Sequence, residues 1–143
     1  MSNTLTSPPA GHSPARRSII SAQLQTQFGL DLGLPIEQCL AGSGLTLSQL
    51  GDPASEIDAS QELILIGNLV AALGHIPDLG LLAGQRYHLS TYGIWGFALL
   101  SCPTLRSAAN MGLRYLDLTY AFCRMHLEEH GDDIHLRLDE QDL

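Results

Sequence analysis

The sequence contains no lysine, and its seven basic residues are all arginines, set against fifteen acidic residues for a formal net charge of −8. Binding to the phosphate backbone of DNA or RNA needs clustered Lys or Arg side chains, which displace condensed counterions. The arginines are scattered along the chain, and only Arg16 and Arg17 are adjacent. This charge balance argues against nucleic-acid binding by the 143 residues themselves.

Cysteine is also scarce. Cys39, Cys102 and Cys123 are odd in number, far apart and without a CxxC pair, which argues against a disulfide framework and against a zinc site. Cys102 is formally a candidate nucleophile if a distant histidine lies beside it. Its position before Pro103, between apolar segments, favours an inert thiol instead.

Long apolar runs are missing as well. No window reaches the ~18 apolar residues that a membrane-spanning helix needs. The adjacent arginines are followed by glutamines, where an export signal would have a continuous apolar stretch. We therefore expect a cytoplasmic protein with no membrane segment.

What the chain does contain is enough apolar material for a folded domain, at 45% of its residues. Residues 1–17 are rich in proline and small polar side chains, and we expect a disordered tail there. Apolar spacing of three and four residues, with Gly, Pro, Ser, Thr or Asp at the ends, predicts helices in the chain that follows. The predicted helices cover about 18–29, 35–42, 46–50, 58–74, 77–86, 91–101 and 104–120.

The helix expected near 91–101 is apolar on every side. Tyr92, Trp95 and Leu99 share one face, and Phe97 and Leu100 lie on the adjacent one. This pattern predicts burial over most of the helix circumference, with Gly93 and Gly96 allowing another backbone to approach closely.

After Tyr120 the apolar residues alternate with polar ones, which predicts a β-hairpin turning at Gly131 and Asp132. The expected cross-strand pairs are Leu127 with Leu136, Met125 with Leu138, Glu128 with His135 and His126 with Arg137. The fold class is therefore α+β, with a mainly helical N-terminal two-thirds packed on a small antiparallel sheet that begins with this C-terminal hairpin. Because a lone hairpin is marginal in water, either helices cover it or more strands follow; we favour a chain that is a fragment.

The densest polar and aromatic cluster precedes the apolar helix. Arg86, His88, Tyr92 and Trp95 are our candidate ligand-binding residues, because an arginine fork, hydroxyl groups and an aromatic wall suit a small anion or amino acid. The plainer alternative is that Arg86 is solvated and the aromatic rings belong to the core. That alternative is the commoner outcome for such a pattern.

A metal site on the hairpin is a second hypothesis. His126, Glu128 and His135 would share one face, but Arg137 would be a cation in the same patch, which favours cross-strand ion pairs. No GxSxG, Walker, dinucleotide-binding or HExxH motif occurs. We expect no metal, no cofactor and no enzymatic activity; an enzyme would need Cys102, His126 or His135 clustered in a cleft.

The stretch "DLGLLAGQRYHLSTYGIWGFALLSCPTLRSAANMGLRYLDL" resembles AraC-type transcriptional regulators of the ornithine-utilisation and virulence-regulator branch. These carry a Gly-Leu-x-x-Gly element, then YG-x-x-G-(F/Y)-A-(L/I)-x-(S/T)-(S/C)-P-T-L, then a helix with an Arg-Tyr pair. The likeness runs from about 18 to 140. The matching residues are Gly80, Leu81, Gly84, Tyr92, Gly93, Gly96, Phe97, Ala98, Leu99, Ser101, Pro103, Thr104, Leu105, Arg114 and Tyr115.

This resemblance implies that residues 18–143 are an N-terminal regulatory domain of the arabinose-binding type, which senses a small-molecule effector and forms a homodimer. Promoter DNA would be bound by a C-terminal helix-turn-helix domain that is absent from this chain, and the regulatory domain itself would be truncated before its end. The alternative is a free-standing interaction module that pairs with a full-length regulator.

Overall fold

The computed structural model describes residues 4–6, 16–130 and 133–140. The chain divides into two compact units. We call Pro14–Thr91 the helical unit, and Tyr92–Leu143 together with Met1–Ser13 the sheet unit. A short 3₁₀ turn, η1 (Leu89–Tyr92), covers the boundary between the two residue ranges.

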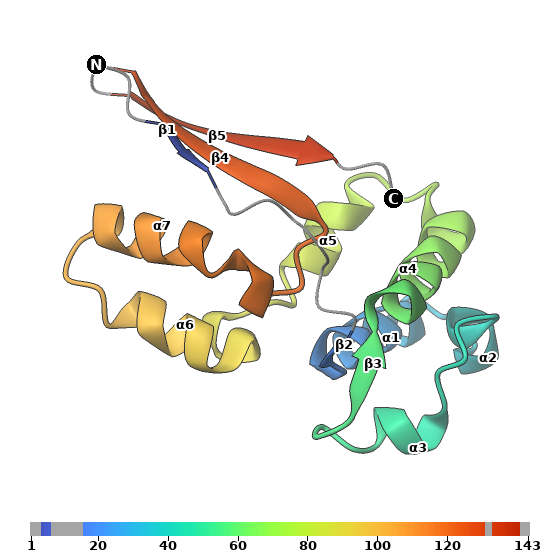
Figure 1. The fold of residues 1–143 in the computed structure, drawn as a ribbon. Coiled ribbons are helices and arrows are strands. Elements are labelled where there is room, and N and C mark those ends of the chain that lie inside the picture. The colour runs from blue at the N-terminus through green and yellow to red at the C-terminus, as the bar shows by residue number, and fades with distance from the viewer. Residues whose placement is uncertain (1–3, 7–15, 131–132, 141–143) are drawn as a thin grey trace. The chain divides into compact units, whose positions relative to one another are not determined.

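The helical unit contains two short strands and five helices among its described residues (Figure 1). Two of the helices, α1 and α4, lie side by side, and α2 contacts both. The core between them is apolar, with Ile19, Leu65 and Cys39 fully buried. In chain order the elements are β2 (Arg16–Ser18), α1 (Ile20–Asp31), α2 (Ile36–Leu40), α3 (Leu47–Leu50), β3 (Glu56–Asp58), α4 (Ala59–Leu73) and α5 (Leu79–Gly84).

Helix α1 does not stop at Gly29, contrary to the prediction of a helix ending there. Gly29 is buried inside α1, where an added Cβ would lie 2.7 Å from Leu69 Cδ2 and 2.8 Å from Cys39 Sγ. The helix ends at Asp31, and Gly33, with a φ of +89°, reverses the chain just after it. The Gly33 amide donates to Leu30 O and the Leu34 amide donates to Gly29 O, the two bonds of a Schellman motif. Gly29 therefore serves close packing rather than helix termination.

Two helix starts in this unit follow the local signals in the sequence. Thr46 caps α3 and Asp58 caps α4, each in a capping box completed by a glutamine three residues later, Gln49 and Gln61. The predicted single turn at 46–50 and the long helix ending near Gly74 are thus confirmed. Such caps satisfy backbone N–H groups that the first helical turn leaves without partners.

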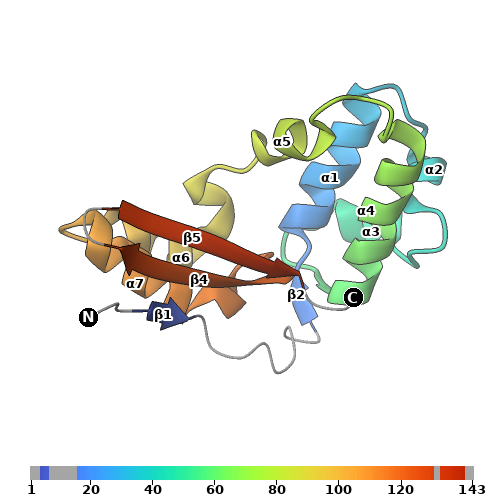
Figure 2. The same ribbon diagram turned by 90° about the horizontal axis from the view of Figure 1, so that it is seen from above.

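The sheet unit contains a three-stranded antiparallel sheet in the order β1-β4-β5, with two helices on one side of it (Figure 2). Within this unit α7 lies next to the sheet and contacts β1, and α6 packs on α7. The elements are β1 (Thr4–Thr6), α6 (Gly93–Leu100), α7 (Leu105–Arg114), the 3₁₀ turn η2 (Leu116–Leu118), β4 (Cys123–His130) and β5 (Asp133–Glu140).

The predicted hairpin register is confirmed in full: Leu127 pairs with Leu136, Met125 with Leu138, Glu128 with His135 and His126 with Arg137. The predicted turn at 131–132 lies outside the described residues. The α+β class and the C-terminal hairpin are therefore both correct.

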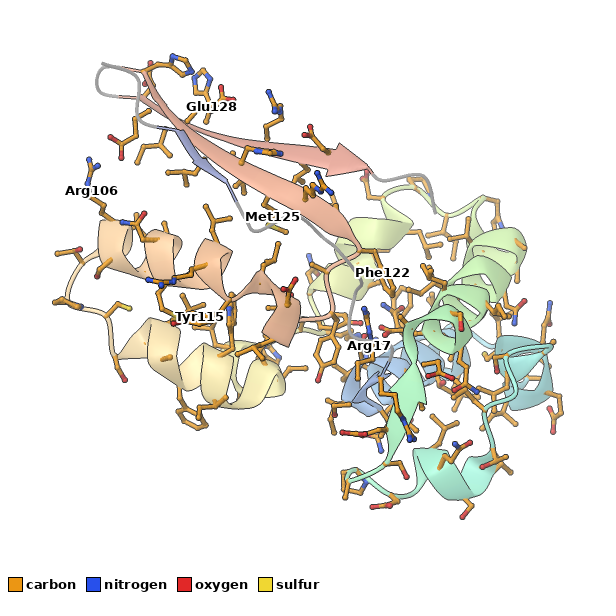
Figure 3. All side chains as sticks on the ribbon, viewed as in Figure 1. Arg17, Arg106, Tyr115, Phe122, Met125 and Glu128 are labelled. Carbon is orange, nitrogen blue, oxygen red and sulfur yellow. The ribbon has the colours of Figure 1, made fainter. Side chains whose placement is uncertain are left out.

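The apolar face of the hairpin is only partly covered. Arg106 of α7 forms an ion pair with Glu129, so the face of β4 that carries Glu129, Leu127 and Met125 is turned toward α7 (Figure 3). On β5 the apolar side chains of the same face remain more than half exposed: Ile134, Leu136 and Leu138.

Helix α6 contradicts the prediction of burial on most sides. Ile94 is 80% exposed, Phe97 64% and Leu100 66%, and Gly96 is its buried residue. Neither Thr91 nor Ser90 caps it; Tyr92 occupies the N-cap position without a side-chain cap. The physical reason is that α6 packs against α7 with one face only. Because apolar residues occur on every side of α6, the sequence pattern does not distinguish the packed face from the exposed one. Helix α7 also ends at Arg114, earlier than the predicted end near 120, and η2 begins at Leu116.

Two strands overlap residues 1–17, the segment that we expected to be a disordered tail. Thr4–Thr6 pairs with Glu128 to His126 of β4, and Arg16–Ser18 pairs with Asp58 to Glu56 of β3. A β-ladder uses backbone groups that every residue except proline has in full, so a polar composition does not prevent it. The other residues of the segment lie outside the described ranges.

Across the described ranges, no helix combines the length and the apolar character that a membrane span requires.

Candidate functional site

Two of the predicted ligand residues, Tyr92 and Trp95, belong to an aromatic cluster in the sheet unit. The Tyr92 ring lies 5.3 Å from Trp95 and 5.6 Å from Tyr120, measured between centroids, in tilted geometry. Trp95 Nε1 donates a hydrogen bond to Gly112 O at 3.3 Å. Burial, together with the neighbouring Tyr120 hydroxyl, raises the pKa of Tyr92 above its ordinary value. The cluster is half-buried, and its rings combine apolar faces with polar tips.

The cluster packs against a glycine that the sequence analysis did not single out. A Cβ at Gly112 would lie 3.3 Å from Leu99 Cδ2 and 3.4 Å from Trp95 Cζ2. The absence of a side chain at Gly112 therefore favours the close approach of α6 and α7. We expected Gly93 to allow such an approach, but a Cβ added there would have no atom within 4 Å. Gly93 adopts a φ of +54°, so its role is a turn at the start of α6.

The other two predicted ligand residues, Arg86 and His88, belong to the helical unit. Arg86 NH1 lies 2.6 Å from Asp31 Oδ2, and the guanidinium lies over the Phe28 ring at 5.7 Å. Hydrogen bonds from Gln27 and then Arg86 lower the pKa of Asp31. Arg86 is thus partly exposed and paired with Asp31, and it holds the chain after α5 against α1.

His88 is exposed, and its backbone N–H donates to Thr91 Oγ1 at 3.2 Å. The four predicted residues therefore fall in two groups, Arg86 with His88 in one unit and Tyr92 with Trp95 in the other. Each group has its own local partners.

A buried polar network in the helical unit escaped the sequence analysis. Glu62, on the first turn of α4, forms an ion pair with Arg17 of β2 at 3.3 Å, and the two side chains are 1% and 3% exposed (Figure 3). Ser21 of α1 donates a short hydrogen bond to Glu62 Oε1, and Ser21 Oγ lies 2.7 Å from Tyr87 Oη. Gln25 Nε2 donates to the same tyrosine oxygen at 2.8 Å.

The electrostatics of Glu62 reflect opposing influences. Loss of water around the carboxylate raises its pKa, while the Ser21 hydrogen bond and the Arg17 charge pull in the other direction, and the net direction is upward. One signal of this site was visible in the sequence: Glu62 occupies the same helix face as the buried Leu65, Leu69 and Leu73. An acid in an apolar stripe needs a buried partner, but the stripe alone does not identify Arg17, which lies 45 positions away.

The polar face of the hairpin forms a cross-strand ion pair, as the alternative to a metal site predicted: Arg137 Nη1 lies 3.3 Å from Glu128 Oε1. On the same face His126 Nε2 lies 2.9 Å from Asp139 Oδ2. The rings of His130 and His135 contact each other in tilted geometry, with their centroids 4.9 Å apart. Within the described ranges, no three His, Cys, Asp or Glu side chains come together in a group able to hold a metal ion.

The thiols are reduced in the part of the chain that the structure describes. Cys102 Sγ lies 3.3 Å from Ala98 O and donates a hydrogen bond to it. Cys39 is buried in the core, and burial raises the pKa of its thiol. Neither environment is the electropositive one that activates a cysteine.

Comparison with known proteins places these features in a family. Residues 33–143 match the arabinose-binding domain of AraC transcription regulator, N-terminal. Two uncharacterized HTH-type transcriptional regulators, from Mycobacterium bovis and Mycobacterium tuberculosis, are each 30% identical to the chain over 137 residues. The alignment covers 93% of this chain and 40% of each relative, so the chain spans about two-fifths of their length. No solved structure matches.

The family model covers well over half of the chain, and the matched residues include α4, the aromatic cluster and the hairpin. A domain of this family is part of a transcription regulator and not an enzyme. The chain belongs to the family of arabinose-binding N-terminal domains of AraC-type transcription regulators.

Proposed function

We propose that this chain is the effector-sensing and self-associating input domain of a cytoplasmic bacterial regulator, in the ornithine-utilisation and virulence-regulator branch. Promoter DNA would be bound by a separate C-terminal helix-turn-helix domain. The observation that carries this proposal is family membership over residues 33–143. The charge of −8 without a lysine supports the division of labour, because these residues lack the cationic patch that DNA binding needs.

We place effector binding at the aromatic cluster of Tyr92, Trp95 and Tyr120. Its rings are half-buried and its hydroxyl groups supply polar contacts, which matches the mixed lining of small-molecule sites. An effector acts by binding one arrangement of the domain more tightly than another, and so shifts the population toward it. Arg86 and His88 remain separate candidates within the helical unit, where the guanidinium suits an anionic ligand group.

Trp95 offers a direct test, since it is the only tryptophan in the sequence. L-Arabinose, L-ornithine and acetate are titrated separately against the 143-residue chain, and Trp95 fluorescence is followed. We expect a saturable change with one of the three probes, and a weaker apparent affinity in Tyr92→Phe. Tyr115→Phe removes the same hydroxyl group from a half-exposed tyrosine of the same unit outside the cluster, and this matched control should overlay the parent. A flat response to all three probes at millimolar concentration contradicts effector sensing of this chemistry.

We place self-association at the exposed face of α6. Ile94, Phe97 and Leu100 recur every three residues, and no charged residue occurs between Tyr92 and Leu105. An apolar patch of this kind marks an interaction surface. A second copy of this chain is the occupant we propose, because the repulsion between two chains of charge −8 is weakest when they meet through an uncharged face.

The test is the molar mass in solution by light scattering after size-exclusion chromatography. The parent should be a dimer and Phe97→Glu a monomer, because a buried charge without a partner is costly. Leu47→Glu places the same charge on an exposed leucine of α3 and should stay dimeric. A monomeric parent, or equal behaviour of the two variants, would rule out α6 as the interface.

A further inference from the structure

The buried network of the helical unit joins the two ends of that unit. The chain enters the unit at residue 14 and leaves it at residue 91. Arg17 lies in β2, the first described element after that point, and Tyr87 follows α5, just before η1. Both residues are linked to Glu62, Arg17 directly and Tyr87 through Ser21. One carboxylate therefore connects the first and last segments of the unit.

The hydrogen bonds of this network have a fixed direction. An ionised Glu62 can only accept, so Arg17 and Ser21 both donate to it. The single proton of Ser21 is then used, and Tyr87 must donate its own proton to Ser21 Oγ at 2.7 Å. Gln25 Nε2 donates in turn to Tyr87 Oη. Every donor in this series of bonds points toward Glu62, so one carboxylate orients the bonds that reach both segments.

Burial makes the connection cooperative. Glu62 is 1% exposed and Arg17 3% exposed, so water cannot replace a lost partner unless one of the segments lifts away. The first segment has further support from the β2–β3 ladder, and the last from the exposed Arg86–Asp31 ion pair. The Glu62 network spans both segments.

We propose that Glu62 is a coupling residue that ties β2 and the segment 85–88 to one another, so that the two segments detach from the helical unit together. The device lies in the fold of the helical unit and operates with or without an effector, so it goes beyond the proposed sensing function. It gives the regulator a single point at which both connections of this unit are held or released.

Amide hydrogen exchange of the 143-residue chain, read by mass spectrometry without ligand, tests the coupling. The reporters are the β2 amides and those of Arg86 and Tyr87, which donate to Ala83 O and Gly84 O. In Glu62→Gln, exchange should accelerate by roughly tenfold in both segments at once, with α4 around Leu65 unchanged. Acceleration in one segment alone, or equally throughout the helical unit, would overturn the proposal.

Two further variants sharpen the test. Ser21→Ala cuts the link between Glu62 and Tyr87 and leaves the Arg17 ion pair, so it should accelerate exchange in 85–88 and spare β2. Glu37→Gln makes the same charge change at an exposed position on α2 and should alter neither segment. If Glu62→Gln does not fold, Glu62→Asp replaces it, with the same joint acceleration expected. A β2 response to Ser21→Ala equal to that of 85–88 would contradict the proposed route.

Discussion

The helical unit and the sheet unit use similar residues in opposite ways. In the helical unit leucine and isoleucine are buried in one core, and a glutamate and an arginine are buried with them. In the sheet unit, large apolar side chains are exposed on α6 and β5, and Leu113 is its buried leucine among the described residues. The helical unit also exposes Leu47 and Leu81, so the difference between the units is the buried core and not the absence of exposed apolar side chains.

The largest expected difference between the units concerns leucine truncation. Leu65→Ala removes a fully buried side chain of α4 and should lower the free energy of unfolding by about 2–5 kcal/mol. Leu138→Ala removes a side chain of β5 that is 57% exposed and should change it by less than about 0.5 kcal/mol. Denaturant unfolding followed by circular dichroism measures both. Equal losses would mean that this face of β5 is covered in solution.

A pair of glycines gives the next largest effect. Gly29→Ala and Gly67→Ala both gain helix propensity, but a Cβ at Gly29 meets Leu69 and Cys39, whereas Gly67 has nothing within 4 Å. Gly29→Ala should therefore be less stable than Gly67→Ala by about 1–3 kcal/mol. The melting temperatures of the two variants report the difference. Identical values would contradict close packing at Gly29.

Helix caps should give a smaller and equal effect in the two units. Thr104 caps α7 and Thr46 caps α3, each through a capping box. Thr104→Ala and Thr46→Ala should each lower the free energy of unfolding by about 1 kcal/mol. Exchange rates of the amides in the first turn of each helix report the loss locally. If removal of the cap in one unit leaves stability and exchange unchanged, the helix in that unit is held by packing alone.

The most gradual effect is the pH dependence of the helical unit. Burial raises the pKa of Glu62 above its ordinary 4.5, against the Ser21 hydrogen bond from α1 and the Arg17 charge from β2. The folded state then binds this proton more tightly than the unfolded state does. Its contribution to stability is full below about pH 4.5 and is lost as pH rises through the folded pKa. The stability of the parent minus that of Glu62→Gln should fall with rising pH; a rise would mean that the Arg17 charge dominates.

Local features of this protein were predictable from neighbouring residues. Capping boxes span three positions, and the hairpin register follows from alternation around a short turn. The end of α1 shows the limit of such reasoning. Gly29 and Gly33 are both plausible stops, and only the packing of Leu69 and Cys39 against Gly29 separates them.

The sequence by itself determined the helices with strong caps, the hairpin and its pairing, because those depend on residues within a few positions of one another. The tertiary structure alone decided which face of α6 is covered and which partner Glu62 has. An apolar helix surface carries no mark of its neighbour, and a buried carboxylate joined to Arg17 across 45 positions depends on how β2 and α4 come together.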